Sequence, residues 1–191
     1  MKNYLIKLLL KINLLIIKLY VRNINFGANN MIKGFPLIRN KGIIIFGNSL
    51  KMNSNAFSNP IGGNTRVFIN VLKNGELLIG NNVGISNCAI TCSKKIVIED
   101  NVFVGGNVKL YDTDFHSLKL EERIKDITPN NKAKEITIKS GAFIGAHSII
   151  LKGVTVGKNS IVGAGSVVSK DIPDFEIWAG NPAKFIKSII A

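Results

Sequence analysis

The sequence has few cysteines, histidines and aromatic residues, and each shortage excludes a class of protein. Only Cys88 and Cys92 are present in the 191 residues, so the chain has no disulfide framework and fits a reducing compartment. Aromatic residues are 7% of the chain and are scattered, which excludes a surface for stacking nucleic-acid bases. With two histidines in total, the chain cannot build a three-histidine zinc centre, and we expect no metal.

Acidic residues are also few compared with basic ones. The chain has 12 Asp and Glu against 25 Lys and Arg, which gives a formal net charge of +13. Such an excess predicts a polyanionic neighbour. Because no nucleic-acid module is visible, the remaining candidates are an anionic membrane surface and a phosphate-rich ligand.

A six-residue repeat runs without interruption from Ile138 to Ser169. One position of the repeat is always aliphatic: Ile138, Ile144, Ile150, Val156, Val162 and Val168. Four residues after each of the first five comes a small residue: Ala142, Ser148, Val154, Ser160 and Ser166. A period of six fits neither an amphipathic helix nor a single strand, so the repeat itself is the structural unit. It predicts a chain that turns by about 120° per hexad, with three hexads closing one coil of a triangular prism.

This pattern, together with the segments 170–173 (Lys-Asp-Ile-Pro) and 180–184 (Gly-Asn-Pro-Ala-Lys), resembles the hexapeptide-repeat acyltransferases. The resemblance covers Ile79 to Lys187 and is strongest to the sugar and polysaccharide O-acetyltransferases. It implies an all-β fold, a left-handed parallel β-helix.

The chain divides by composition into three parts. Residues 1–24 predict an amphipathic helix, residues 25–173 the β-helix, and residues 174–191 a tail with a short helix at 183–190. The Asn- and Gly-rich stretch 25–78 predicts irregular first coils. Regular hexads begin at Ile79 and slip by one residue near Lys94–Lys95. The second inward position of these hexads, which takes small or aliphatic residues, is expected to be filled by Val83, Ala89, Val102 and Val108.

The first 24 residues allow two interpretations. On a helix Lys7, Lys11, Lys18 and Arg22 fall within about 60° of arc, and the remaining surface is largely Leu and Ile. A spanning helix would place Lys11 near the middle of the bilayer, at a cost of roughly 2.5–3.5 kcal/mol. We therefore expect either a helix lying on an anionic membrane through residues 1–22, or one packed on its own domain or a second subunit. The expected location is cytoplasmic, with peripheral contact at the inner face of the membrane.

The repeat is interrupted between Tyr111 and Glu135, which predicts an ordered loop extruded from the prism. His116 lies in this loop, and its imidazole can act as a general base near neutral pH. Asp112 and Asp114 lie shortly before it, and either carboxylate could hold the other ring N–H. His147 falls on an outward turn of a regular coil, where a solvated or subunit-contact role is expected.

The resemblance implies further roles. His116 would remove the proton from an acceptor hydroxyl that attacks the thioester of acetyl-CoA, with Asp114 as its preferred partner. Asn87 would face the acceptor, although it could equally support a corner of a coil. Asp112 is a second expected substrate-binding residue. Acetyl-CoA would lie in a groove between neighbouring subunits of a homotrimer. The residues expected along that groove are Gly145, Ala146, Gly163, Ala164, Lys170 and Lys184.

The sequence thus predicts an acetyl-CoA-dependent O-acetyltransferase that acts on a hydroxyl of a saccharide, with a cell-surface polysaccharide or its precursor as acceptor. An amino-sugar N-acyltransferase is the alternative within the enzymes. A non-catalytic β-helix scaffold tethered to a membrane is the alternative outside them. His116 favours an enzyme, because a scaffold needs no histidine in an extruded loop close to two carboxylates.

Overall fold

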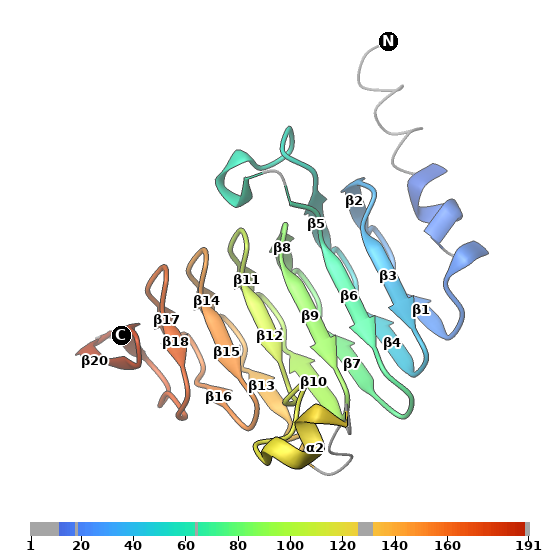
Figure 1. The fold of residues 1–191 in the computed structure, drawn as a ribbon. Helices are drawn as coiled ribbons and strands as arrows, with labels where there is room; N and C mark the ends of the chain where they lie inside the picture. The colour runs from blue at the N-terminus through green and yellow to red at the C-terminus, as the bar shows by residue number, and fades with distance from the viewer. Residues whose placement is uncertain (1–11, 18, 64, 126–131, 190–191) are drawn as a thin grey trace.

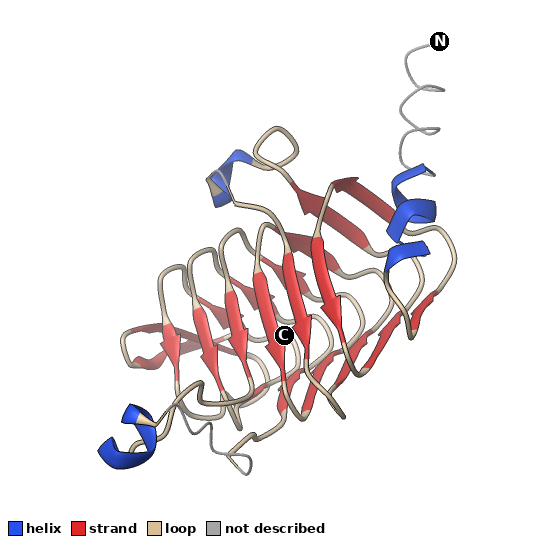
Figure 2. Cartoon of the chain, turned by 45° about the vertical axis from the view of Figure 1, so that its right-hand side comes forward, coloured by secondary structure: helices blue, strands red, loops and turns tan. Residues whose placement is uncertain are grey.

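The computed structural model of the protein describes residues 12–17, 19–63, 65–125 and 132–189. The chain winds around one axis, and its strands form three parallel sheets, here named A, B and C, which are the faces of a prism (Figure 1). Each coil contributes one strand to A, then one to B, then one to C (Figure 2). The predicted left-handed parallel β-helix is confirmed.

The strands are short, and each pairs with the strand one coil away. Sheet A holds β1 (Ile24–Phe26), β4 (Ile43–Phe46), β7 (Glu76–Ile79), β10 (Lys95–Ile98), β13 (Ile136–Ile138) and β16 (Thr155–Val156). Sheet B holds β2 (Met31–Gly34), β5 (Lys51–Ser54), β8 (Gly84–Ser86), β11 (Phe103–Val104), β14 (Phe143–Ile144), β17 (Ile161–Val162), β19 (Glu176–Gly180) and β20 (Ala183–Ser188). Sheet C holds β3 (Leu37–Asn40), β6 (Phe68–Val71), β9 (Ala89–Cys92), β12 (Lys109–Tyr111), β15 (Ile149–Leu151) and β18 (Val167–Val168).

The repeat from Ile138 to Ser169 builds the interior as predicted. The six aliphatic residues at its inward position are all buried, and so are the five small residues between them. The buried serines are hydrogen-bonded: the Ser148 and Ser166 hydroxyls donate to the Gly163 carbonyl, at 3.0 and 2.6 Å. A small side chain therefore suits each corner, because it packs inside the turn and pairs with corner backbone.

The first coils are regular, so the prediction of irregular coils over residues 25–78 is wrong. The parallel pairing already joins β1 to β4 and β2 to β5. The asparagines of this stretch are corner residues: Asn29 and Asn74 have φ of 58° and 67°. Asparagine tolerates this left-handed conformation better than most residues. The Asn- and Gly-rich composition that suggested irregular coils is therefore the composition of β-helix corners. One corner of this stretch does carry a loop, residues 55–66, with a 3₁₀ turn η1 at Pro60–Gly62.

The hexads are irregular near Lys94–Lys95, as predicted, because Ile90 to Ile98 spans eight positions where Ile150 to Val156 spans six. The preceding corner is irregular too. Cys88, not Ala89, is the buried corner residue between β8 and β9, and Ala89 is half-buried. The corner at Asn87 is one residue shorter than the next one, since Ile85 to Ile90 spans five positions and Val104 to Leu110 spans six. Asn87 makes this tight turn with a φ of 42°.

The predicted helix at 183–190 is wrong. Residues 183–188 form β20, which pairs antiparallel with β19 and closes the end of sheet B. An isolated helix of eight residues is marginal in water, whereas pairing with β19 gives the backbone of this segment its hydrogen bonds. The turn at Asn181–Pro182, a cis peptide bond, joins the two strands.

Part of the predicted N-terminal helix is present, at residues 12–17 and 19–20. Ile17 is buried in the core cluster, and the Asn13 side chain donates to the Gly34 carbonyl at 3.3 Å. Packing on its own domain thus accounts for one side of this helix. Lys7, Lys11 and Lys18 lie outside the described residues. Within the described ranges no helix is both long and apolar enough to cross a membrane.

Candidate functional site

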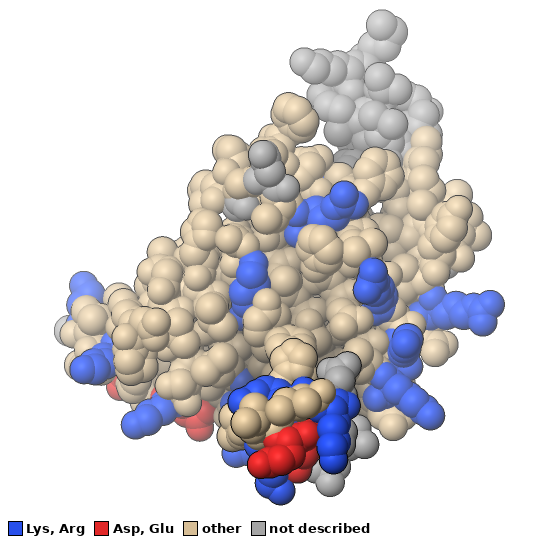
Figure 3. Space-filling view, in the orientation of Figure 1, with Lys and Arg blue, Asp and Glu red and all other residues tan. Residues whose placement is uncertain are grey.

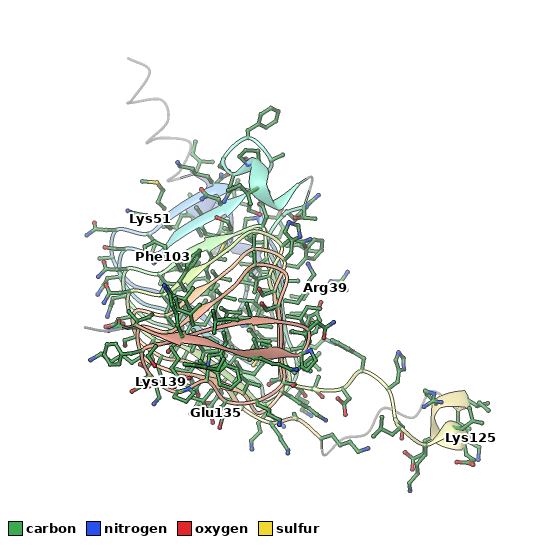
Figure 4. The ribbon with its side chains drawn as sticks, turned by 90° about the vertical axis from the view of Figure 1, so that its left-hand side faces the viewer. Arg39, Lys51, Phe103, Lys125, Glu135 and Lys139 are labelled. Carbon is green, nitrogen blue, oxygen red and sulfur yellow. The ribbon has the colours of Figure 1, made fainter. Side chains whose placement is uncertain are left out.

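The extruded loop leaves the prism at the corner between sheets C and A. Its neck is closed by backbone hydrogen bonds, because the Lys134 N–H donates to the Asp112 carbonyl at 2.8 Å and the Gly153 N–H to the Lys134 carbonyl at 3.2 Å. The residues between carry the short helix α2 (Leu120–Ile124). Figure 4 shows Lys125, at the end of this helix, well outside the prism. Residues 112–125 and 132–135 are the described part of this loop.

His116 is held in position through its neighbours, while its own ring faces solvent. Phe115 packs edge-on against Tyr111, with ring centroids 5.2 Å apart. On the other side Ser117 is buried, and its hydroxyl donates to Glu122 on α2 at 2.5 Å. His116 is exposed and makes no hydrogen bond within the described chain. A free imidazole on an anchored backbone is suited to proton transfer with a bound acceptor.

The two carboxylates that precede His116 in the sequence have other partners. The Lys152 ammonium donates to Asp114 at 2.5 Å, and this ion pair ties the loop to the corner of the following coil. Asp112 is fully buried, and its oxygens accept the backbone N–H groups of the preceding coil at 2.7–2.9 Å, from Ser93, Lys94 and Lys95. The Asp112 carboxylate therefore holds a corner of the prism and presents no oxygen to solvent.

The expected coenzyme residues line the corner between sheets B and C. We call Gly105, Gly145–Ala146 and Gly163–Ala164, which stack in successive coils, the glycine column. A Cβ on Gly105 would lie 2.7 Å from the Ala146 nitrogen, and one on Gly145 would lie 2.5 Å from the Ala164 nitrogen. These glycines are thus required by the close stacking of coils. The N–H groups of Ala146 and Ala164 donate to no acceptor in the described part of the chain, so they remain available to a ligand.

Asn87 lies at the same corner, two coils before Gly145, and is almost fully buried. Its side-chain amide donates to the backbone carbonyls of Asn59 at 2.9 Å and Asn55 at 3.4 Å. These bonds anchor the 55–66 loop, as a corner-supporting role requires. The Asn87 Oδ1 has no partner among the described residues. Asn87 therefore supports the loop with its amide nitrogen and keeps one acceptor unused.

The 55–66 loop borders a pocket that sequence reasoning missed. The pocket has a volume of about 340 Å³ and lies on face B, where Asn59 and Ile61 of the loop approach Phe103, Phe143 and Ala146. Phe103 and Phe143 are exposed and pair in register on β11 and β14. Figure 4 shows Phe103 on this face beside Lys51. The signal was present in the sequence, since an aromatic residue precedes the inward residue in two successive coils.

The remaining candidates, Lys184, Lys170 and His147, lie at different places on the prism. Lys184 is exposed on β20, opposite Ala179, and Ala179 packs over Gly163. Lys170 is exposed and follows β18, at the corner between sheets C and A. His147 takes a left-handed corner conformation with a φ of 64°, and its Nδ1 lies 3.0 Å from the Asn107 amide. His147 is thus a corner residue on the edge of the glycine column.

The two thiols do not belong to a reactive site. Cys88 and Cys92 are buried, and burial raises the pKa of each to about 12. No group of three His, Cys, Asp or Glu side chains is placed to hold a metal ion in the ranges that the structure describes.

Within one chain the candidate residues therefore occupy two corners of the prism. His116, Asp114 and Lys170 lie at or beyond the corner between C and A. Asn87 and the glycine column lie at the corner between B and C, and the pocket lies on face B next to that corner. The width of sheet C separates them. One copy of the chain does not bring the histidine and the glycine column together.

Part of the chain is similar to known transferases. Residues 135–170 match the family described as bacterial transferase hexapeptide (six repeats). The galactoside O-acetyltransferase of Escherichia coli K12 is 37% identical over 106 residues, which cover 54% of this chain and 49% of that protein. The chain spans about half the length of the curated relatives it matches.

Solved structures show the same similarity. A hexapeptide-repeat acetyltransferase of Vibrio cholerae, complexed with acetyl coenzyme A, superposes with a TM-score of 0.56 and 31% identity, covering 60% of this chain and 61% of that one. The maltose O-acetyltransferase of Clostridium difficile 630 superposes with a TM-score of 0.55 and 35% identity, covering 60% of each chain.

Proposed function

We propose that this chain is a member of the hexapeptide-repeat acetyltransferases, to which it is similar, and that it transfers an acetyl group from acetyl-CoA to a hydroxyl of a saccharide. The observation that carries the proposal is His116, an exposed histidine on an anchored loop of a β-helix whose opposite corner offers free backbone N–H groups. The relatives support the substrate class, because those named above acetylate a galactoside and maltose.

His116 acts as the general base. Its unprotonated ring nitrogen takes the proton of the acceptor hydroxyl as the oxygen attacks the thioester carbonyl carbon. The tetrahedral intermediate then expels the coenzyme A thiolate, which receives the proton from the imidazolium. A free N–H of the glycine column, from Ala146 or Ala164, donates to the developing oxyanion. Lys184 lies at the end of the column, where it is suited to the phosphates of coenzyme A.

Asp114 acts as a positioning residue rather than as a direct partner of His116. Its ion pair with Lys152 fixes the first turn of the loop from which His116 projects. Asp112 is left out of the acceptor site, since its carboxylate is used by the backbone of residues 93–95.

The active site is shared between copies of the chain in a homotrimer. The separation of His116 from the glycine column across sheet C supports this, because the loop of one copy must reach the column of another to complete the site. Closed symmetry also gives each copy the same contact.

A mixing experiment tests the shared site. His116→Ala removes the base, and Ala164→Arg blocks the glycine column at an exposed position; each variant alone should be inactive. Random co-assembly from denaturant at equal amounts should restore about a quarter of wild-type activity, because one site in four pairs an intact loop with an intact column. Co-assembly without recovery, together with trimers seen by light scattering, would place the whole site in one copy.

An acceptor panel tests the substrate class. Release of coenzyme A thiol is measured with galactosides, maltose and polysaccharide fragments, and with glucosamine as the amine control. We expect transfer to hydroxyl acceptors, with the cell-surface polysaccharide or its precursor as the acceptor in the cell. Transfer to glucosamine nitrogen alone would replace the proposal with an amino-sugar N-acyltransferase.

We also propose peripheral contact with an anionic membrane through residues 1–22, at its inner face. The helical residues that are described support this by their exposed side, which carries Leu15 and Leu19. Deletion of residues 1–11 should weaken sedimentation with anionic vesicles while leaving Ile17 in the core and the transferase active.

A further inference from the structure

The end of the prism formed by the first two coils exposes large apolar side chains. Phe57, in the 55–66 loop, is 100% exposed, and Leu19 of the helical segment is 74% exposed. Tyr20, Phe35 and Ile61 are exposed at the same end. We call these five residues the N-terminal edge. Lone apolar residues on a surface are ordinary, but a group gathered at one end marks an interaction site.

The helical segment, the corner at Phe35 and the 55–66 loop lie next to one another at this edge. The Asn13 side chain of the helical segment donates to the carbonyl of Gly34, the residue before Phe35. Phe35 in turn lines a hollow of about 360 Å³ with Asn55, Ala56 and Arg66 at the base of the loop. Figures 1 and 2 both show the loop and the helical segment at the same end of the prism.

The charge of this end is of one sign. The first acidic residue of the chain is Glu76, so residues 1–75 contain 11 Lys and Arg and no Asp or Glu, against 14 and 12 in residues 76–191. The basic residues described here are all exposed: Arg22, Lys33, Arg39, Lys41, Lys51, Arg66 and Lys73. In Figure 3 the acidic side chains lie only at the lower edge of the molecule, away from this end.

We propose that the N-terminal edge docks on an anionic lipid surface, with Phe57 and Leu19 inserted among the headgroups and the surrounding Lys and Arg against lipid phosphates. Exposed aliphatic and aromatic side chains beside unopposed positive charge are the features of an interfacial membrane site. The charge argues against a second copy docked on the same edge, since two acid-free surfaces would repel. Leu19 and Ile61 argue against nucleic acid, because aliphatic side chains offer bases no stacking surface.

The proposal extends the membrane contact of residues 1–22 to the 55–66 loop, and it does not depend on acetyl transfer. It also has a consequence for the pocket on face B. Because the loop borders that pocket and is anchored on Asn87, docking through Phe57 would place the mouth of the pocket beside the lipid surface.

The test is sedimentation of the full chain with vesicles of phosphatidylcholine alone or mixed with phosphatidylglycerol. We expect binding to the mixed vesicles only, weakened as salt rises from about 0.1 M to about 0.5 M. Phe57→Glu and Leu19→Glu should each weaken binding by about tenfold or more, through loss of apolar insertion and gain of negative charge. Ile124→Glu on α2, at an equally exposed apolar position, should leave it unchanged.

A second variant reports insertion directly. Phe57→Trp should show a blue-shifted emission on adding mixed vesicles, and Ile124→Trp should not. Equal binding of Phe57→Glu and wild type, or no spectral shift for Phe57→Trp, would overturn the proposal. So would binding to duplex DNA but not to vesicles. A lower oligomer mass for Phe57→Glu in light scattering would assign the edge to a second copy instead.

Discussion

Replacing Asp112 by alanine should destabilise the fold far more than replacing Asp114, although both carboxylates lie shortly before His116 in the sequence. Asp112 is fully buried and accepts three backbone N–H groups. Each buried backbone N–H that is left without an acceptor costs about 1–3 kcal/mol. Because Lys94 is exposed, water can pair with its N–H, and only the N–H groups of Ser93 and Lys95 stay unpaired. We therefore expect the free energy of unfolding to fall by about 3 kcal/mol. Asp114 and Lys152 are partly exposed, so that ion pair should contribute about 0–1 kcal/mol.

The assay is equilibrium unfolding in urea at a fixed protein concentration, since assembly makes stability depend on concentration. With a slope of about 2 kcal/mol per M, the midpoint of Asp112→Ala should fall by about 1.5 M, and that of Asp114→Ala by less than about 0.5 M. A wild-type midpoint for Asp112→Ala, together with a raised KM for the acceptor, would refute the corner role. Asp112 would then face the acceptor, as the sequence alone suggested.

Two further predictions follow from the packing. Gly145→Ala would put a Cβ 2.5 Å from the Ala164 nitrogen of the next coil. It should lower the free energy of unfolding by about 1–3 kcal/mol, whereas Ala164→Gly at the exposed neighbour should cost less than about 1 kcal/mol in the same urea assay. Cys88 and Cys92 have pKa values raised by burial to about 12, from an ordinary 9.0, so at pH 8 a thiol reagent should label them only after unfolding. Between pH 9 and 12 the thiols of the unfolded chain ionise while those of the folded protein stay neutral, which favours unfolding. The contribution of these thiols to stability is therefore complete below pH 9 and should decrease as the pH rises toward 12. Rapid labelling of the native protein would contradict their burial.

The sequence predicts the interior of the prism well because each hexad is a local unit. Whether Ile144 points inward depends on its own position in the turn, and the same rule holds for Val156 and Val168. The corners are harder to read. Asn29 and Asn74 occupy left-handed positions that glycine also fills, so the early coils look irregular although their strands pair in register.

The parts that could not be predicted depend on neighbours distant in sequence. Residues 183–188 are a strand because β19 lies beside them. Asp112 is a corner residue because its donors lie 17–19 positions earlier in the chain, on the coil below. The Asn87 side-chain amide donates to carbonyls 28 and 32 positions earlier in the chain, on a loop that the repeat pattern does not predict. His116 and the glycine column lie at different corners for a similar reason, since the corner that each occupies depends on how the coils stack.

The central claim is that His116 is the general base of acetyl transfer, and single-turnover transfer by His116→Ala tests it most directly. The variant is mixed with acetyl-CoA and the best acceptor of the panel, and acetylated product is followed by mass spectrometry. We expect a rate about 10²–10⁴-fold below wild type. The acetyl-CoA affinity and the urea midpoint should be unchanged, because the exposed His116 makes no hydrogen bond within the described residues. His147→Ala should stay within a few-fold of wild type. A rate for His116→Ala within a few-fold of wild type would contradict the account.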